Sequence, residues 1–567
     1  MPLAVVAAVV AVAFGLAYII YGRLLARLFT LDSAQATPAC TVNDGVDYVP
    51  TPKFLLLGQH FSAITAAGPI VGPILAGIWF GWGPALLWIV GGAIFFGSVH
   101  DFSSLIGSVR HGARSVAEIV GEHMGRRAYL LFLGFIWLSL VYVIIAFTDL
   151  TSASFVEPTL GGGVASSSIM YLLLGILMGL VLRTGRVSLP VATAIFLPLV
   201  GLAVWCGQRL PVMLPLGLPI RPVLAWDMLL LGYCCVASVM PVWLLLQPRG
   251  YLGGWFLYAA LFAGCVGLLF GGETVDYPAF IGMQSAGGVP LFPMLFVTIA
   301  CGACSGFHGI VSSGTTSKQI QREPDCRAVG YGAMLLEGVV AVIALATVMI
   351  LAPGDPLLSM PPDRIYAAGL GRFVQRLGIS AEFAGAFALL AFTTFIYDTL
   401  DVATRLGRYI LQELTGWRGW RGRVGATLAM LALPAICVGT TITDAQGRVV
   451  PAWKAFWVLF GTSNQLLAAL TLLGLTMWFV RLRKPWWVLG IPMAFMSIVT
   501  LWALTLTFGP WLLGVVTGQR GMEIVGFVAL VLSVLAVLLL VQGCRSWLSA
   551  DAGVMQPGHT LQASSKR

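Results

Sequence analysis

Two glycine–proline pairs stand in the middle of a long apolar segment. Residues 54–80 are apolar enough to cross a bilayer, and Gly68-Pro69 and Gly72-Pro73 lie near their centre. Proline lacks the amide that continues a helix, and its ring clashes with the preceding turn. Interrupted backbone at that depth is tolerated only where protein buries it or where it lines a watery cavity. The segment therefore predicts a discontinuous span with a polar binding site, as in secondary transporters, in preference to a simple kink.

The remainder of the chain is equally apolar. Of its 567 residues, 58% are hydrophobic and 10% are charged, and the mean hydropathy is +0.92. Barrel strands would be about 10 residues long with alternating polarity, and no such pattern occurs. Apolar runs of about 20 residues instead predict an all-α polytopic membrane protein with about 15 transmembrane helices. The predicted spans are 2–22, 54–80, 83–108, 128–149, 166–183, 188–206, 225–247, 251–271, 290–310, 331–352, 383–404, 424–440, 453–480, 486–508 and 522–542.

Loop charges predict the orientation of these spans. The odd-numbered loops and the C-terminus hold 24 of the 32 lysines and arginines, and the opposite side holds 8. Cytoplasmic loops carry the excess of positive charge, so we expect an external N-terminus and a cytoplasmic C-terminus. A basic face against anionic membrane lipids also accounts for the net charge of +9 without a nucleic-acid partner.

No soluble domain is expected, because loops 23–53 and 353–382 are too short to bury a core of their own. The chain is one integral membrane domain. We divide it into a first helix and cytoplasmic loop (1–53), a transport core (54–410), accessory helices (411–545) and a disordered tail (546–567).

A second interruption suggests an internal repeat. Pro241 lies within the seventh predicted span, five spans after the first interruption. Because five is odd, a second unit would enter the membrane from the opposite side, which is typical of inverted repeats. We predict a five-plus-five core in which spans 2–6 match spans 7–11, with an ordinary kink at Pro241 as the alternative. Substrate would bind where the two discontinuous helices meet, at Gly68, Pro69, Gly72, Pro73, Met240 and Pro241.

Several polar side chains lie inside the predicted spans. They are His60, His100, Asp101, Ser305, His308, Glu337, Asp398 and Asp401. An ionisable group at such depth costs a few kcal/mol unless it is paired or hydrated, so each is a candidate functional residue. Asp401 with Arg405, four residues later, favours a structural pair. Glu337 at a helix start is expected to complement the helix dipole, and Asp398 near a span end to be hydrated.

Ion coupling is predicted at His60, Asp101, Ser305 and His308. Histidine titrates near neutral pH and suits a coupling proton, so H⁺ is the expected coupling ion. For His60, Asp101 and His308 a satisfied polar network remains an equal alternative. Ser305, with carbonyls freed near the Gly-Pro pairs, would instead favour Na⁺. Asp398, Asn464 and Gln465 are secondary candidates; the last two bind substrate or hold helices together.

Cys301 and Cys304 form a CxxC pattern with His308 four residues later. A metal site needs further ligands from elsewhere in the chain. We therefore expect small-residue helix packing here, no metal site and no cofactor.

Motifs along residues 43–475 resemble the carbon starvation protein A family of bacterial inner-membrane transporters. They include Gly58-Gln59-His60-Phe61, the Gly68–Pro73 stretch, Asp101-Phe102, Ser238–Arg249, Ser305-Gly306-Phe307-His308, Ser312–Thr316, Tyr331–Met334 and Phe460–Ala468. The family resembles the amino acid–polyamine–organocation group, which implies the same five-plus-five core. It also implies uptake of a small carboxylate such as pyruvate, or of short peptides, with proton coupling.

The chain departs from the family pattern near the predicted coupling layer, at Gln59, His100, Cys304 and Asp398. A membrane-embedded enzyme and a non-transporting sensor are the alternatives. A membrane-embedded enzyme would use His100, Asp101 or His308, but phosphate-binding loops, nucleophile elbows and metal-spaced acidic motifs do not occur. A sensor that binds substrate without moving it would be expected to carry a signalling domain. We therefore predict a transporter working by alternating access, and not an enzyme.

Overall fold

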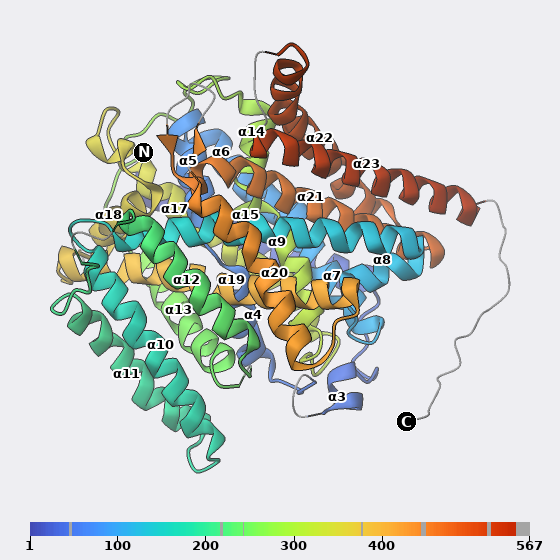
Figure 1. Cartoon of the computed structure of the whole chain (residues 1–567), viewed down its shortest axis with the longest axis horizontal. Helices are drawn as coiled ribbons and strands as arrows, with labels where there is room; N and C mark the ends of the chain where they lie inside the picture. Colours follow the sequence, from blue (N-terminus) through green and yellow to red (C-terminus); the bar gives the residue numbers. More distant parts are fainter. Residues whose placement is uncertain are drawn as a thin grey trace.

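The computed structural model is almost entirely helical (Figure 1). It describes residues 1–44, 48–215, 219–241, 243–375, 378–440, 442–443, 449–518 and 523–551. Within that part of the chain the strands are β1 (Ile442–Thr443) and β2 (Val449–Val450), an antiparallel pair with Ile442 opposite Val450. The predicted all-α class is confirmed.

The helices of the first half begin with α1 (Leu3–Leu16), η1 (Ala17–Tyr21) and α2 (Gly22–Leu28), which together form one span. They continue with α3 (Pro38–Val42), α4 (Lys53–Ile64), α5 (Gly68–Phe80), α6 (Trp82–Gly92), η2 (Ala93–Gly97), α7 (Ser98–Arg110), α8 (Val116–Met124), α9 (Arg126–Phe155), α10 (Gly161–Arg183), α11 (Leu189–Gly207), α12 (Pro222–Val239) and α13 (Leu246–Phe270).

The second half contains α14 (Leu291–Thr298), α15 (Ala300–Ala303), α16 (Gly306–Val311), η3 (Ser312–Thr316), η4 (Arg327–Gly332), α17 (Ala333–Met349), η5 (Pro356–Ser359), α18 (Pro362–Gln375), α19 (Ala381–Thr415), α20 (Gly419–Gly439), α21 (Ala452–Arg481), α22 (Trp487–Val516) and α23 (Ile524–Asp551).

Among the described residues, thirteen helices are long and apolar enough to cross a membrane, and the bent pair α4–α5 makes a fourteenth candidate. These match fourteen of the fifteen predicted spans. The remaining predicted span, residues 290–310, is divided into the short helices α14, α15 and α16. This interruption was not predicted from the sequence. The helical path ends between α15 and α16, where the backbone at Ser305 is extended rather than helical.

Contacts between loops show which helix ends share a side of the molecule. Glu323, just after η3, accepts hydrogen bonds from the Asp32 amide and from Arg110. Lys484 donates to the carbonyl of Leu28, and Arg481 donates to the carbonyl of His123. The loops after the first, third, ninth and thirteenth predicted spans therefore lie together. We call this face the basic side.

The opposite face carries the N-terminus. The amide of Leu3 donates to the carbonyl of Glu273, and Arg372 forms an ion pair with the Glu273 carboxylate at 2.9 Å. Gln542, near the end of α23, instead contacts the carbonyl of Met124 on the basic side. The start of α1 and the end of α23 thus lie on opposite sides of the described part of the molecule.

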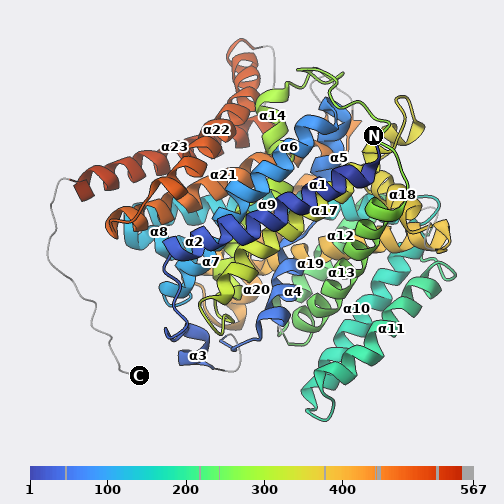
Figure 2. The ribbon, with the colours of Figure 1, turned by 180° about the vertical axis from the view of Figure 1, so that it is seen from behind.

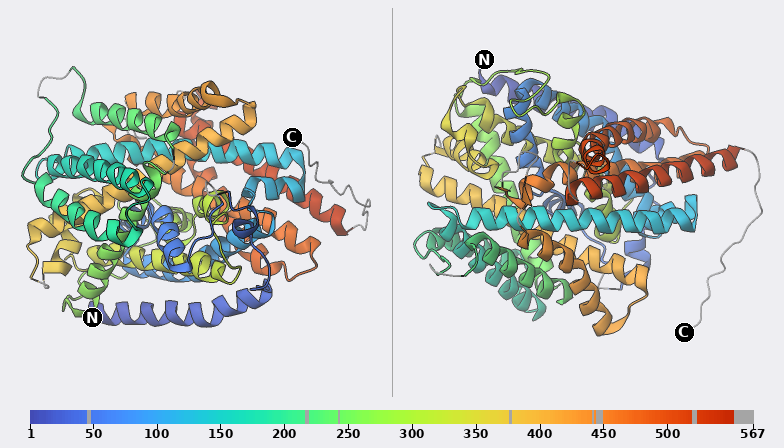
Figure 3. Two further views of the ribbon diagram at one scale, coloured as in Figure 1. Left: turned by 90° about the horizontal axis from the view of Figure 1, so that it is seen from below. Right: turned by 45° about the horizontal axis from the view of Figure 1, so that its top comes forward.

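The interior is formed by α9, α17, α19 and α21, which are largely buried, whereas α1, α11 and α23 are mostly exposed. Figure 2 shows α1 and α2 crossing the back of the molecule, and the left panel of Figure 3 shows these two helices along one edge of the molecule. Exposed Val5, Val9 and Leu16 on α1 form an apolar surface. Such a surface suits contact with lipid acyl chains.

Two predictions about chain termini and breaks are wrong. Pro241 does not interrupt a helix: α12 ends at Val239 and α13 begins at Leu246. The predicted disordered tail begins too early, because α23 continues to Asp551; residues 552–567 lie outside the described part. The pairing of spans 2–6 with 7–11 stays a prediction.

Candidate functional site

The two discontinuous segments, α4–α5 and α14–α16, pack against each other at the centre of the molecule. The α4–α5 pair bends by 51° at Thr65–Ala67, so the bend directly precedes the first Gly-Pro pair. A Cβ added to Gly68 would lie 2.2 Å from Cys301 Sγ, and one added to Gly72 would lie 2.3 Å from the Thr298 carbonyl oxygen. A Cβ added to Gly302 would lie 2.7 Å from the Ala341 Cβ on α17 and 3.6 Å, an ordinary contact, from the Pro69 Cα. Glycine is needed here because no Cβ fits against the Cys301 side chain at Gly68 or against the Thr298 carbonyl at Gly72.

Asn464 of α21 holds the interruption between α15 and α16. Its Oδ1 accepts the Phe307 amide at 2.9 Å, and its Nδ2 donates to Ser305 Oγ at 3.0 Å and to Cys301 Sγ at 3.2 Å. Gln465 donates to the carbonyl of Phe296 at 3.3 Å. Buried amides left free by a helix break need such partners. These contacts fit the alternative in which Asn464 and Gln465 hold helices together.

Asp101 of α7 lies at the centre of a buried charged cluster. Its Oδ1 lies 2.8 Å from His100 Nδ1, and its Oδ2 lies 2.7 Å from His308 Nδ1 on α16. All three side chains are inaccessible to solvent. A Cβ on Gly309 would lie 3.0 Å from His100 Nε2, so this glycine lets α16 approach α7.

Glu337 of α17 extends the cluster. Its Oε2 lies 3.1 Å from His308 Nε2, within ion-pair distance though not aligned as a hydrogen bond. His308 thus lies between two carboxylates on different helices. The expected role of Glu337 at a helix start is wrong, because η4 precedes α17 and Glu337 faces His308. Asp101, His100, His308 and Glu337 are hereafter the Asp101 cluster.

His60 of α4 does not join this cluster through a direct bond. Its Nδ1 lies 2.9 Å from Thr316 Oγ1 at the end of η3. Its Nε2 is buried and has no hydrogen-bond partner in the described part of the chain. The structure therefore brings Asp101 and His308 together and places His60 beside the segment that follows α16.

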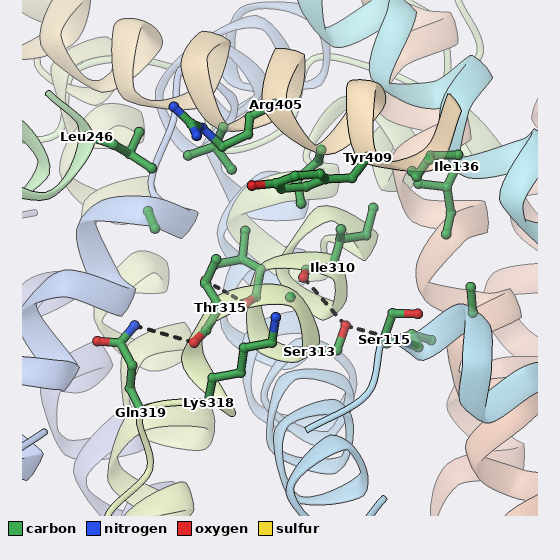
Figure 4. A pocket seen from close by; sticks show the side chains of 18 of the residues that line it. Ser115, Ile136, Leu246, Ile310, Ser313, Thr315, Lys318, Gln319, Arg405 and Tyr409 are labelled. Carbon is green, nitrogen blue, oxygen red and sulfur yellow. Dashed lines mark hydrogen bonds between the residues drawn. The ribbon is translucent and has the colours of Figure 1, made fainter. Parts of the chain in front are cut away.

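A cavity of about 460 Å³ lies on the basic side of the molecule. Its lining combines α4, α8, α9, α13, α16, η3 and α19. Figure 4 shows Arg405 and Tyr409 on one wall, from α19, and Lys318, Thr315 and Ser313 on the other. Apolar side chains and a few polar groups around a volume of several hundred Å³ are typical of a small-molecule site.

The cavity and the Asp101 cluster share one interrupted segment. Ile310 of α16 and Ser313 of η3 line the cavity. In the same segment, His308 belongs to the Asp101 cluster and Thr316 contacts His60. A rearrangement of this segment would therefore affect both regions. Lys318 and Arg405 supply the positive charges of the lining, and Glu413 supplies a negative one.

Arg405 and Asp401 are not paired with each other, contrary to the expectation. Arg405 donates to the carbonyls of Ala237 and Met240, at 2.7 and 2.8 Å, at the end of α12. Asp401 instead lies 2.6 Å from Arg249 Nη1.

The remaining predicted site residues lie apart from the α5–α15 contact. Met240 and Pro241 follow α12, which packs against α9, α19 and α20. Asp398 belongs to α19, and its side chain lies outside the described residues. Sequence reasoning missed the cavity residues Lys318, Tyr409 and Glu413. The charge of Lys318 next to the Ser312–Thr316 motif was the available signal.

Comparison with known proteins places the chain in a family. The family model described as carbon starvation protein CstA matches residues 2–365 and 357–503. The peptide transporter CstA of Escherichia coli K12 is 32% identical over 560 residues, covering 86% of this chain and 78% of that protein. The pyruvate/proton symporter BtsT of the same organism is 30% identical over 580 residues, covering 86% and 79%.

A more distant relative and a solved structure were also found. The peptide transporter CstA of Bacillus subtilis is 28% identical over 591 residues, covering 94% of this chain and 95% of that protein. A manganese transporter of Eremococcus coleocola aligns with a TM-score of 0.48 at 13% identity, covering 90% of this chain and 99% of that one. From the family match and the relatives above 30% identity, the chain belongs to the carbon starvation protein CstA family.

Proposed function

We propose that this protein is a secondary active transporter that imports a small carboxylate, such as pyruvate, or short peptides, together with protons. The names of its relatives supply the two substrate classes and the proton. The observation that carries the proposal is Asp101 held between two histidines, next to a segment that lines a cavity. Buried titratable groups of this kind mark proton pathways in transporters.

The cavity is the proposed substrate site in one access state. Lys318 and Arg405 would attract a carboxylate, and Glu413 would attract the amino group of a peptide. Ser62, Ser313 and Gln319 offer hydrogen bonds to the remainder of the molecule. Since the lining comes from turns and helix ends of the basic side, this is the state open to that side.

The Asp101 cluster is the proposed coupling site. His308 contacts both Asp101 and Glu337, so one proton on its ring balances part of two negative charges. Loss of that proton would leave two buried carboxylates without this compensation, which is costly in a low-dielectric interior. Movement of α16 would then be favoured, and the same segment borders the cavity.

Proteoliposome uptake tests the proposal. Purified protein is reconstituted with a pH gradient, acid outside, and accumulation of labelled pyruvate and of a labelled dipeptide is measured. We expect accumulation of one class that a protonophore abolishes and a sodium gradient does not replace. Binding without flux would favour a sensor, and chemical conversion of the substrate would favour an enzyme.

Dependence on sodium alone would contradict proton coupling. In that case Ser305 and the carbonyls beside the Gly-Pro pairs become the coupling candidates. Ser305 Oγ already accepts from Asn464, so a sodium ion there would have to share that oxygen.

We also propose that the basic side is cytoplasmic and that the protein lies in the bacterial inner membrane. The support is the excess of lysine and arginine on that side. Reporter fusions should be active in the cytoplasm after Arg483 and outside near Gly287. The reverse pattern would contradict the orientation.

A further inference from the structure

A second group of potential ligands lies on the basic side, apart from the Asp101 cluster. His111 directly follows α7, and Glu122 and His123 lie in the last turn of α8. Nε2 of His111 lies 3.0 Å from Nε2 of His123. A carboxylate oxygen of Glu122 and one ring nitrogen of each histidine lie within 4.8 Å of one another. Imidazole nitrogens and a carboxylate are preferred zinc ligands.

The two histidine rings are held in place. His111 Nδ1 lies 2.7 Å from the Gly107 carbonyl, which accepts its proton and leaves a lone pair on Nε2. The rings meet edge to face at 85°, and Trp478 packs against the other side of His111. Such support behind a histidine ligand fixes its tautomer and orientation.

Either a hydrogen bond or a bound cation joins the two Nε2 atoms, because two lone pairs would repel each other at 3.0 Å. In a hydrogen bond, Nε2–H of neutral His123 donates to the lone pair of His111 Nε2, and Glu122 pairs only with Arg114. A metal ion is the alternative. Ligands of a tetrahedral zinc ion, with bonds of about 2.0–2.1 Å, are roughly 3.3 Å apart, which requires only a small outward shift.

Neighbouring charges permit this arrangement. Glu122 lies 3.3 Å from Arg114, but both side chains are about half exposed, and such surface pairs are weak.

We propose that His111, Glu122 and His123 bind one divalent transition-metal ion, zinc being the best fit, where the end of α7 meets the end of α8. The fourth position would be open to water. The segment that joins α7 to α8 supplies Ser115 and the first residue of α8, Val116, to the cavity, so a bound ion would fix one wall of that cavity. The inference does not depend on the transported substrate.

Metal binding to the purified full-length protein tests this site. Metal-free protein, with exposed Cys40 and Cys544 replaced by serine, is titrated with zinc in competition with a coloured chelator. We expect one ion per chain, and at least tenfold weaker binding in His111→Gln and His123→Gln. His559→Gln, in the tail outside the described residues, is the matched control and should bind like the parent. Cobalt should give the intense visible absorption of tetrahedral coordination.

Equal zinc affinity in the parent and in the His111→Gln/His123→Gln variant would overturn the proposal. Absence of zinc binding to the parent would also overturn it and leave a hydrogen bond between the two rings. Melting temperatures without metal identify any variant that fails to fold. His111 is only partly buried, so its variant retains the test if His123→Gln does not fold.

Discussion

Two buried aspartates in this protein have opposite surroundings. Asp401 of α19 contacts Arg249 at 2.6 Å and accepts from Tyr233 at 2.7 Å, which ties α19 to α12 and α13. Asp101 of α7 contacts His100 and His308. Arginine keeps its proton at any physiological pH, whereas histidine titrates near neutrality. Asp401 therefore has a permanent counter-charge, whereas the counter-charge of Asp101 depends on protonation of a histidine.

The largest effect is expected at the titratable aspartate. Asp101→Asn keeps the size of the side chain and removes its charge, so accumulation against a gradient should fall to background. Exchange of substrate across the membrane should persist, because only the proton step is lost. Counterflow and pH-driven uptake in proteoliposomes measure the two separately. Wild-type accumulation by this variant would show that Asp101 is not the coupling acid.

Breaking the Arg249–Asp401 pair should lower the stability of the fold, and the loss of transport should follow from that. Arg249→Met leaves Asp401 buried without its cation, and breaking such a pair typically costs about 3–5 kcal/mol. We expect much less folded protein in the membrane, measured by fluorescence-detected size exclusion. Arg249→Met combined with Asp401→Leu should recover part of the yield. Arg322→Gln, at a mostly exposed arginine, is the control and should change the yield little. Normal yield with lost coupling in Arg249→Met would instead move the proton step to Asp401.

A smaller effect is expected at Lys318, which belongs to the proposed substrate site. It lines the cavity, and its ammonium lies 5.6 Å from the centre of the Tyr48 ring. Lys318→Gln should raise KM for a carboxylate substrate about tenfold, equivalent to about 1.4 kcal/mol, with little change in kcat. Lys318→Arg should keep most of the affinity. An unchanged KM would exclude Lys318 from the substrate site.

The smallest effect is expected at His60, which binds Thr316 but neither carboxylate of the Asp101 cluster. His60→Gln preserves a hydrogen-bonding group and should lower the uptake rate only a few-fold, with proton dependence retained. Loss of proton dependence in this variant would extend the titratable region to α4. The measurement is the uptake rate between pH 5.5 and 8, compared with wild type.

The sequence was sufficient for features that depend on local pattern. Long apolar runs located the spans. The first Gly-Pro pair marked the start of α5, but Gly72-Pro73 lies inside that helix and does not interrupt it, contrary to the prediction. The common depth of Asp101 and His308 anticipated a cluster, and their contact at 2.7 Å is present. The roles of these side chains in coupling stay predictions.

Features set by tertiary contacts were not predictable in this way. Asp401 and Arg405 are four residues apart on one helix, yet each bonds to another helix instead. The interruption at Ser305 is stabilised by Asn464, 159 positions away in the sequence. Pro241 resembles a kink in sequence, but α12 ends before it and Arg405 binds the freed carbonyls. A partner distant in sequence decides each case.

The contact of Gly68 and Gly72 with Cys301 and Thr298 has a mechanical consequence. No room is left for a Cβ between Gly72 and the Thr298 carbonyl or between Gly68 and the Cys301 side chain, so we expect α5 and the α14–α15 segment to move together. The bend at Thr65–Ala67 is then the place where the chain can flex, with α4 as the arm beyond it. Any rocking between access states would turn about that short link, carrying His60 with the arm while the glycine contact stays closed.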